Sequence, residues 1–212
     1  MATIRLLAAA LRASIVILIG GTANAAVPDI EIGAASKVVN QVYGTPESTN
    51  QPRWWRQGLD VFHNETVVTA QASATRVRFK DESQLSVGPT SQVKLDDFVY
   101  DPDPKFSAVS ISMVTGVFRF VGGKLSSERF KITTPAGSIA VRGTVFTVLI
   151  LDNGGEYIAV ESGTIYVTCH QGVTVALRAG EMTYIRSAQG SPTQPQRSIP
   201  IPAVAQMDQM LQ

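Results

Sequence analysis

The chain has 212 residues, a formal net charge of +1 at pH 7 and 44% hydrophobic residues. A charge this close to zero gives no electrostatic reason to bind nucleic acid or an anionic membrane surface. The only cysteine, Cys169, excludes an intramolecular disulfide, so the stability of the fold must come from a hydrophobic core, for which a single domain of this size suffices.

Residues 1–25 have the layout of a secretory signal peptide. Arg5 and Arg12 precede a short apolar run, and Ala23 and Ala25 offer the small residues that a signal peptidase requires. The alternative is an uncleaved membrane anchor, but the run is shorter than the roughly 20 apolar residues that span a bilayer. We therefore predict cleavage after residue 25 and a periplasmic or secreted protein with no stable transmembrane span.

Residues 26–53 form a lead-in to the main domain and contain one weak helical candidate at residues 37–42. Trp54 and Trp55 follow, flanked by arginines at positions 53 and 56. Adjacent tryptophans in this setting are typical of an aromatic anchor. The anchor could be a cap over the start of the core or a ligand platform, and we favour the cap.

Residues 54–186 have an apolar pattern with a period of two, which is typical of β-strands. In residues 74–80, for example, Thr75, Val77 and Phe79 fall on one side of the predicted strand and basic residues on the other. Further strands are predicted at 85–87, 93–95, 109–114, 117–121, 131–133, 139–141, 145–151, 157–160, 164–168, 173–177 and 182–185. The pattern predicts an all-β domain.

Two segments of this domain, residues 112–120 and 159–167, are similar to each other. Each consists of a β-run, a glycine (Gly116 or Gly163) and a second β-run, which indicates a corner in the chain. Corners that recur without a strict period favour an irregular β-solenoid or roll of short stacked strands. A β-sandwich is the alternative, and the strand pattern by itself does not exclude it.

Residues 187–212 read as a Pro/Gln-rich linker followed by a short C-terminal tail. The composition of residues 187–202 predicts an extended linker. Residues 203–212 could form two or three helical turns with Val204, Met207, Met210 and Leu211 on one side. Because an isolated helix of this length is marginal in water, we favour a frayed end over a docking helix.

The segment T-T-P-A-G-S-I-A-V-R-G-T-V-F, at residues 133–146, resembles the core motif of FecR-type domains. The residues that carry the resemblance are Thr134, Pro135, Gly137, Val141, Arg142, Gly143, Thr144 and Phe146. Residues 58–69, 79–91 and 160–167 are similar to three other elements of that family, in the same order. The resemblance implies a stacked, twisted β-fold, which favours the solenoid, and a non-enzymatic envelope module, since these domains are best known as periplasmic parts of transducers in bacterial iron uptake.

The resemblance departs from the transducers at the N-terminus. Those proteins place a cytoplasmic sigma-regulating segment and a membrane helix ahead of the periplasmic domain, whereas residues 1–25 here read as a signal peptide. We therefore expect a stand-alone FecR-type protein that does not act directly on a sigma factor.

Within the motif, Arg142 is the residue that stands out. Gly143 can supply a backbone shape that other residues avoid, and Thr144 can form a hydrogen bond within the corner. Arg142 brings five donors in a fixed fork. We favour a bracing role for Arg142 between neighbouring parts of the domain, with recognition of a carboxylate on a partner as the alternative.

Arg76, Arg78 and Lys80 line one strand face, and we call these three residues the basic stripe. A stripe of this kind is usually a solvated surface. The alternative is a surface that binds an anionic glycan or an acidic partner.

We find no catalytic constellation, metal site or cofactor motif in the sequence. Cys169 and His170 are adjacent, so in a strand their side chains point to opposite faces, and His63 has no metal-spaced partner. The best carboxylate cluster consists of Asp96, Asp97, Asp101 and Asp103. Its spacing matches no known calcium loop and we interpret it as a structural connector. No active-site serine motif or phosphate-binding glycine loop is present.

These observations predict an exported, non-enzymatic protein without a cofactor that acts as a protein-interaction, scaffold or envelope-sensing module. The alternative is a binding module for glycan or another anionic envelope polymer.

Overall fold

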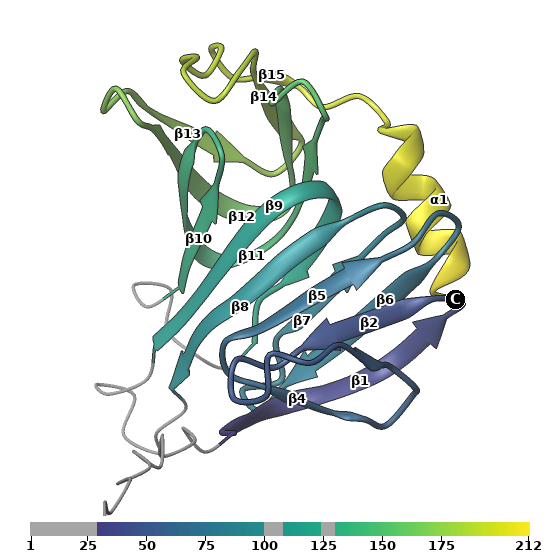
Figure 1. The fold of residues 1–212 in the computed structure, drawn as a ribbon. Coiled ribbons are helices and arrows are strands. Elements are labelled where there is room, and N and C mark those ends of the chain that lie inside the picture. The colour runs from purple at the N-terminus through teal and green to yellow at the C-terminus, as the bar shows by residue number, and fades with distance from the viewer. Residues whose placement is uncertain (1–28, 100–107, 124–129) are drawn as a thin grey trace, which may run out of the picture.

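The computed structural model describes residues 29–99, 108–123 and 130–212 and shows an all-β protein with one short helix (Figure 1). The predicted signal peptide lies outside the described residues. The strands are β1 (Glu31–Val39), β2 (Val42–Thr45), β3 (Arg53–Trp54), β4 (Asp60–Phe62), β5 (Glu65–Thr69), β6 (Ala74–Phe79), β7 (Gln84–Val87), β8 (Gln92–Val99), β9 (Ala108–Val121), β10 (Phe130–Thr134), β11 (Gly137–Ile150), β12 (Glu156–Cys169), β13 (Thr174–Arg178), β14 (Glu181–Ile185) and β15 (Gln196–Arg197), and the helix is α1 (Pro202–Met210). The all-β prediction is confirmed.

The weak helical candidate at residues 37–42 is wrong. Residues 31–39 form strand β1, which pairs with β4 and β6. Val38 and Val39 are β-branched, and β-branched residues fit a pleated strand better than a helix. Pairing on both sides of β1 therefore decided the structure of a segment whose local pattern was ambiguous.

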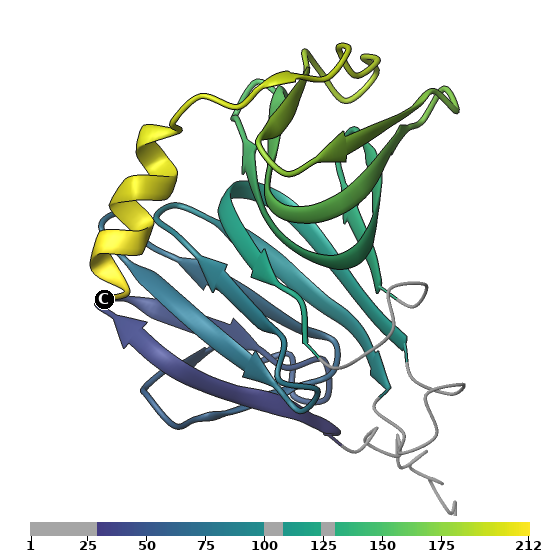
Figure 2. The ribbon, with the colours of Figure 1, turned by 180° about the vertical axis from the view of Figure 1, so that it is seen from behind.

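The strands form one continuous hydrogen-bonded sheet that folds into two halves. Half A contains β4, β1, β6, β7, the second parts of β9 and β11, the first part of β12, β14 and β15. Half B contains β3, β2, β5, β8, the first part of β9, β10, the first part of β11, the second part of β12, and β13. The long strands β9, β11 and β12 thus run through both halves, and the green strands of this region curve strongly in Figure 2.

Each long strand bends at a glycine with positive φ. Gly116 in β9 has φ +107°, Gly143 in β11 has φ +55° and Gly163 in β12 has φ +83°. Glycine adopts these conformations at much lower cost than other residues, and the register of β11 against β12 shifts at its bend. The corners predicted at Gly116 and Gly163 are therefore present, and they carry each strand from one half of the sheet to the other.

The finer prediction of a solenoid is not confirmed. Every described strand pairing except β9–β10 is antiparallel, whereas the coils of a parallel solenoid would stack in parallel. Hairpins reverse the chain after most strands, and a hairpin gives antiparallel neighbours. The sequence indicated where the chain turns but not which way the next strand runs.

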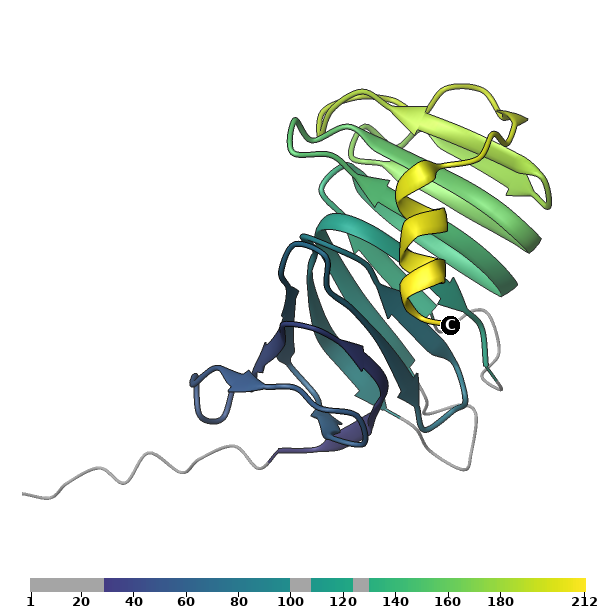
Figure 3. The same ribbon diagram turned by 90° about the vertical axis from the view of Figure 1, so that its right-hand side faces the viewer.

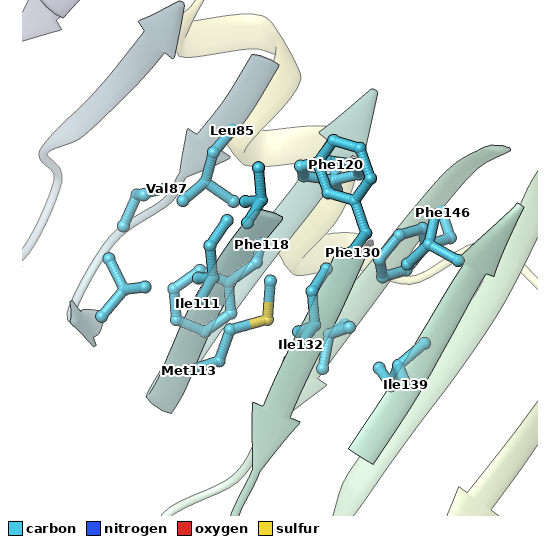
Figure 4. Packing of buried hydrophobic residues seen from close by; sticks show 14 of the residues in the cluster. Leu85, Val87, Ile111, Met113, Phe118, Phe120, Phe130, Ile132, Ile139 and Phe146 are labelled. Carbon is cyan, nitrogen blue, oxygen red and sulfur yellow. The ribbon is translucent and has the colours of Figure 1, made fainter. Parts of the chain in front are cut away.

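The core lies between the inner faces of the two halves. Phe118 and Phe120 from half A pack in one hydrophobic cluster with Ile111 and Ile132 from half B (Figure 4). Phe120 contacts the rings of Phe130 and Phe146, with centroids 5.3 Å and 5.7 Å away. The period-two alternation of the sequence places these side chains inward and the polar residues between them outward.

Helix α1 docks on the outer face of half A, contrary to the favoured prediction of a frayed end. Met207 and Leu211 are buried against Ala74 and Val117, and Figure 3 shows the helix lying across the strands. A Cβ on Gly88 would lie only 3.1 Å from the Cβ of Met207, so a glycine at this position permits the close approach. Burial of these side chains compensates for the low intrinsic stability of a helix this short. Of the helices that the structure describes, none is long and apolar enough to cross a membrane.

Candidate functional site

A buried carboxylate anchors the segment that contains the two tryptophans. Glu65, the first residue of β5, is 0% exposed. Its carboxylate accepts hydrogen bonds from Nε of Arg53 at 3.0 Å and Nη2 of Arg53 at 2.8 Å, a bidentate pair. It also accepts from Nε1 of Trp55 at 3.1 Å and from the backbone N–H of Phe62 at 3.0 Å. Four donors from three residues therefore fix the position of residues 53–55.

The same anchor presents an exposed aromatic surface. The side chain of Trp54 is 69% exposed and makes an edge-to-face contact with Tyr43, at 5.7 Å between ring centroids. Tyr43 and Trp54 are paired residues of β2 and β3. Together with Pro52 and Arg53 they line a hollow of about 350 Å³, which we call the aromatic pocket.

The cap interpretation fits Trp55, and the platform interpretation fits Trp54. Trp55 is buried in the core and caps it, as we favoured. Trp54 faces outward and lines the aromatic pocket, so it has the geometry of the platform alternative. Neighbouring residues in an extended chain point to opposite faces, which is why one pair serves both purposes.

A second buried carboxylate holds the turn of the family-like motif. Glu156 is 0% exposed and accepts hydrogen bonds from Oγ1 of Thr134 at 2.7 Å and from the backbone N–H of Ala136 at 2.8 Å. On the other side of the turn, Nε2 of His170 donates to the carbonyl oxygen of Pro135 at 2.9 Å. The turn between β10 and β11 is thus tied to both ends of β12.

Sequence reasoning missed Glu65 and Glu156. Both are charged residues that begin an apolar strand directly after a turn containing Asn64 or Gly154, which have positive φ. A glutamate at that position is usually exposed, and only its distant partners make burial possible.

Burial raises the pKa of Glu156 above the usual value for a glutamate, and the hydrogen bonds from Thr134 and Ala136 and the nearby His170 oppose this effect. The folded protein therefore retains a proton at pH values where the unfolded chain has released it. Consequently, the free energy of unfolding falls as the pH rises from the usual glutamate pKa, about 4.3, to the raised value.

We expect a Glu156→Gln variant to lose this pH dependence. Wild type should lose stability relative to the variant as the pH rises through that interval, with a slope of at most about 1.4 kcal/mol per pH unit. Urea denaturation followed by circular dichroism, in steps from about pH 4 to about pH 8, measures the difference. If the free energies of unfolding of wild type and variant changed with pH in parallel, Glu156 would titrate in the folded protein as it does in the unfolded chain.

The V-R-G-T corner is only partly described. The backbone of Arg142 pairs with Thr164, but the position of its side chain lies outside the described part, so its bracing or recognition role stays a prediction. Gly143 has the positive φ that we expected. The side-chain oxygen of Thr144 is buried without a hydrogen-bond partner among the described residues, so the predicted bond within the corner is not found.

The basic stripe lies on the outer face of half A. Arg76 is half-buried, with its Nε 3.4 Å from Oγ of Ser86, and Lys80 forms an ion pair with Glu31 at 3.5 Å. Arg78 is exposed. The three residues share one face of β6 or its end, and a binding role for them stays a prediction.

The other candidate residues are spread over the fold. Cys169, the last residue of β12, is buried, and His170, in the turn that follows, is exposed. Asp96 accepts a hydrogen bond from Oγ of Ser112 and lies 3.6 Å from Nζ of Lys94. The other aspartates of that cluster lie outside the described side chains. Within the described ranges, no three His, Cys, Asp or Glu residues come together in a group that could hold a metal.

Comparison with known proteins gives a family match and structural neighbours. The family model described as "FecR protein" matches residues 65–173, about half of the chain. A search of curated proteins found no significant match. Two crystal structures of a proposed anti-sigma factor from Parabacteroides distasonis ATCC 8503, at 2.50 Å and 1.65 Å resolution, are similar in fold, with TM-scores of 0.52 and 0.51 and identities of 14% and 13%. In both, the similarity covers 63% of this chain and 59% of the neighbour, so this chain matches less than two thirds of the neighbour's length.

Proposed function

The chain belongs to the FecR protein family, and we propose from this that it is an exported regulatory or sensing module that works by binding another protein. Three observations support the proposal. The family match supports a regulatory module, and the structural neighbours, which share its fold, are two structures of a proposed anti-sigma factor. The signal-peptide pattern of residues 1–25 supports a periplasmic or secreted location.

The proposed docking mode rests on the exposure of the Trp54 side chain. Solvent-exposed tryptophan beside tyrosine and arginine is the composition of binding hot spots. Arg53 is held by Glu65 at two points, so the pocket is rigid and little order is lost when a partner binds. Among the described strands, β3 pairs only with β2, which leaves its other edge open. We therefore propose that the partner supplies an extended segment along β3, with an apolar side chain in the aromatic pocket.

We also propose that the protein is not an enzyme. Of the glutamates that the structure describes, Glu65 and Glu156 are 0% exposed, and each has its carboxylate oxygens occupied by hydrogen bonds that hold the fold together. Such groups are used structurally and are closed off from a substrate. These hydrogen bonds therefore support a protein that acts through a binding surface and not through a reactive centre.

Trp54→Ala should reduce affinity for the partner by about 30-fold or more, since truncation of a hot-spot tryptophan typically costs about 2 kcal/mol or more. The partner is first identified by placing a photo-crosslinking amino acid at position 54 in cells of the source and analysing the products by mass spectrometry. Ile199, which is 63% exposed in the C-terminal segment, is the matched control position. An envelope protein captured from position 54 but not from position 199 supports the proposal. Products that contain only polysaccharide, or only this chain, contradict it.

The second candidate function is a module that binds glycan or another anionic envelope polymer through the basic stripe. The exposed side chain of Arg78, next to Arg76 on the same face of β6, favours it. Retention on an acidic polysaccharide that is lost in Arg78→Glu would support this function, and no retention at low salt would exclude it.

A further inference from the structure

A second hollow lies on the outer face of half B, away from both the aromatic pocket and the basic stripe. Its volume is about 240 Å³, and its lining includes Lys131, Thr133, Gly137, Ser138, Thr168 and His170. The volume is below the roughly 300–1,000 Å³ of pockets for drug-sized ligands, so the hollow suits one small unit of a longer ligand. We call it the hydroxyl pocket.

Hydrogen bonds to the adjoining turn hold the walls of the hydroxyl pocket in place. Glu156 holds the adjoining turn through Thr134 and Ala136. His170 donates through Nε2 to the carbonyl of Pro135, which leaves Nδ1 as the ring nitrogen available to a ligand. A Cβ on Gly137 would overlap the carbonyl oxygen of Thr168 and lie 2.8 Å from Cα of Cys169, so the floor is closely packed backbone. These contacts make the pocket preformed.

A row of hydroxyl side chains crosses the strands at this pocket. Successive paired residues from β13 to β9 are Thr174, Thr168, Ser138, Thr133 and Ser112, and the row continues to Lys94 in β8. Neighbouring strands lie about 4.8 Å apart, so the side chains of the row follow one another at roughly that spacing, and the hydroxyls of Thr168 and Thr174 approach to 2.9 Å in a hydrogen bond. Hydroxyls both donate and accept, and a regular line of them matches a ligand that carries many hydroxyl groups.

The charge around the pocket is positive. This charge comes from Lys131, which lines the pocket and is exposed, and the lining contains no carboxylate among the described residues. Asp96, which lies beside the β9 end of the row, is already paired with Lys94 and Ser112. An anionic group would therefore be favoured beside Lys131.

From the row, the pocket and its charge we propose that the outer face of β9–β13 binds an extended acidic polysaccharide. One carboxylate-bearing sugar unit occupies the hydroxyl pocket beside Lys131. The neighbouring sugars lie across the strands and exchange hydrogen bonds with the hydroxyl row. This inference is independent of the protein partner proposed for the aromatic pocket.

The test measures binding of the full chain to polygalacturonate, with neutral dextran as the comparison, at about 50 mM and about 200 mM salt. Lys131→Glu should weaken binding to polygalacturonate by about 10-fold or more, the effect of losing one charge-assisted hydrogen bond and adding a repulsion. Arg197→Glu is the matched control, because it makes the same change of charge at an exposed position of β15 in half A, outside the hydroxyl pocket and the basic stripe, and it should change binding less than about twofold. Thr168→Val, which removes one hydroxyl of the row at similar volume, should weaken binding to polygalacturonate without changing its salt dependence.

Backbone amide shifts give a readout that does not depend on charge. On addition of polygalacturonate the amides of Thr133, Ser138 and Thr168 should shift, while those of Tyr43 and Trp54 stay in place. Four outcomes would overturn the proposal: no binding at low salt, equal loss in the two charge variants, loss only in Arg197→Glu, or shifts confined to the aromatic pocket. The Trp54→Ala experiment tests a different surface. A failure of the chain to bind polygalacturonate would therefore not count against the proposed protein partner.

Discussion

Glu65→Ala is expected to lower the free energy of unfolding by about 3–5 kcal/mol, the usual effect of removing one partner of a buried ion pair. Four hydrogen bonds end on this carboxylate, from Arg53, Trp55 and Phe62. The alanine variant removes the acceptor of all four donors. The Arg53 side chain is 27% exposed and can reach water, but Trp55 is buried, and an unsatisfied buried donor costs about 1–3 kcal/mol. The packing of Gly44, where a Cβ would overlap the Glu65 carboxylate, shows how little room there is for rearrangement.

The chain contains a matched control for this prediction. Arg119 and Glu161 also form a bidentate pair, at 2.8 Å and 2.6 Å, but the Glu161 side chain is 43% exposed. Glu161→Ala should therefore cost only about 0–1 kcal/mol. Urea denaturation followed by far-ultraviolet circular dichroism measures both variants without relying on tryptophan fluorescence, which the Glu65 change would alter through Trp55. Equal losses in the two variants would mean that burial of Glu65 contributes nothing to its effect.

Gly116→Ala is expected to destabilise the protein by about 3 kcal/mol or more, the sum of overpacking and backbone strain. Gly116 has φ +107°, and a Cβ there would overlap Oγ of Ser91 and lie 2.5 Å from its Cα. Ser91 cannot move away freely. Its Oγ accepts from the backbone N–H of Val117 at 3.0 Å, and its N–H donates to Oγ1 of Thr69 at 2.9 Å. The substitution therefore strains the bend that carries β9 from half B to half A.

Gly143→Ala separates backbone strain from overpacking. Gly143 also has positive φ, at +55°, but no heavy atom lies within 4 Å of the position of its Cβ. Only the left-handed backbone conformation is penalised, so a loss of about 1 kcal/mol is expected. Thermal or urea unfolding of the two variants gives the comparison, and a loss at Gly116 no larger than that at Gly143 would show that the corner around Ser91 relaxes easily.

The aromatic pocket and the hydroxyl pocket are held in place in the same way. Glu65 begins β5 and fixes the segment that carries Trp54, and Glu156 begins β12 and fixes the turn beside the hydroxyl pocket. In each case a buried carboxylate binds backbone or side-chain donors of a loop, and that loop then presents side chains to solvent. Rigid loops lose little entropy on binding, so this arrangement prepares both surfaces for ligands.

The sequence by itself determined the features that depend on near neighbours. Period-two alternation determined the strands and the inward direction of residues such as Val77 and Phe79, and the glycines at 116 and 163 determined the bends. The family motif around Thr134 and Gly137 was also readable, because it is a local pattern. Adjacent residues of a strand must point to opposite faces, which is why the alternation shows the inward side chains.

Only the tertiary structure decided the features that depend on distant partners. The hydrogen-bond partners of Glu156 on the motif turn lie 22 and 20 residues before it in the chain, and no local pattern shows that a carboxylate will meet donors at that distance. Helix α1 is stabilised by Val117 and Ala74, although its own sequence predicts a frayed end. The direction of each strand is set by hairpins and by the halves of the sheet that meet across the core. Burial of charge, docking of a short helix and strand direction all depend on long-range contacts, and these form only when the whole chain folds.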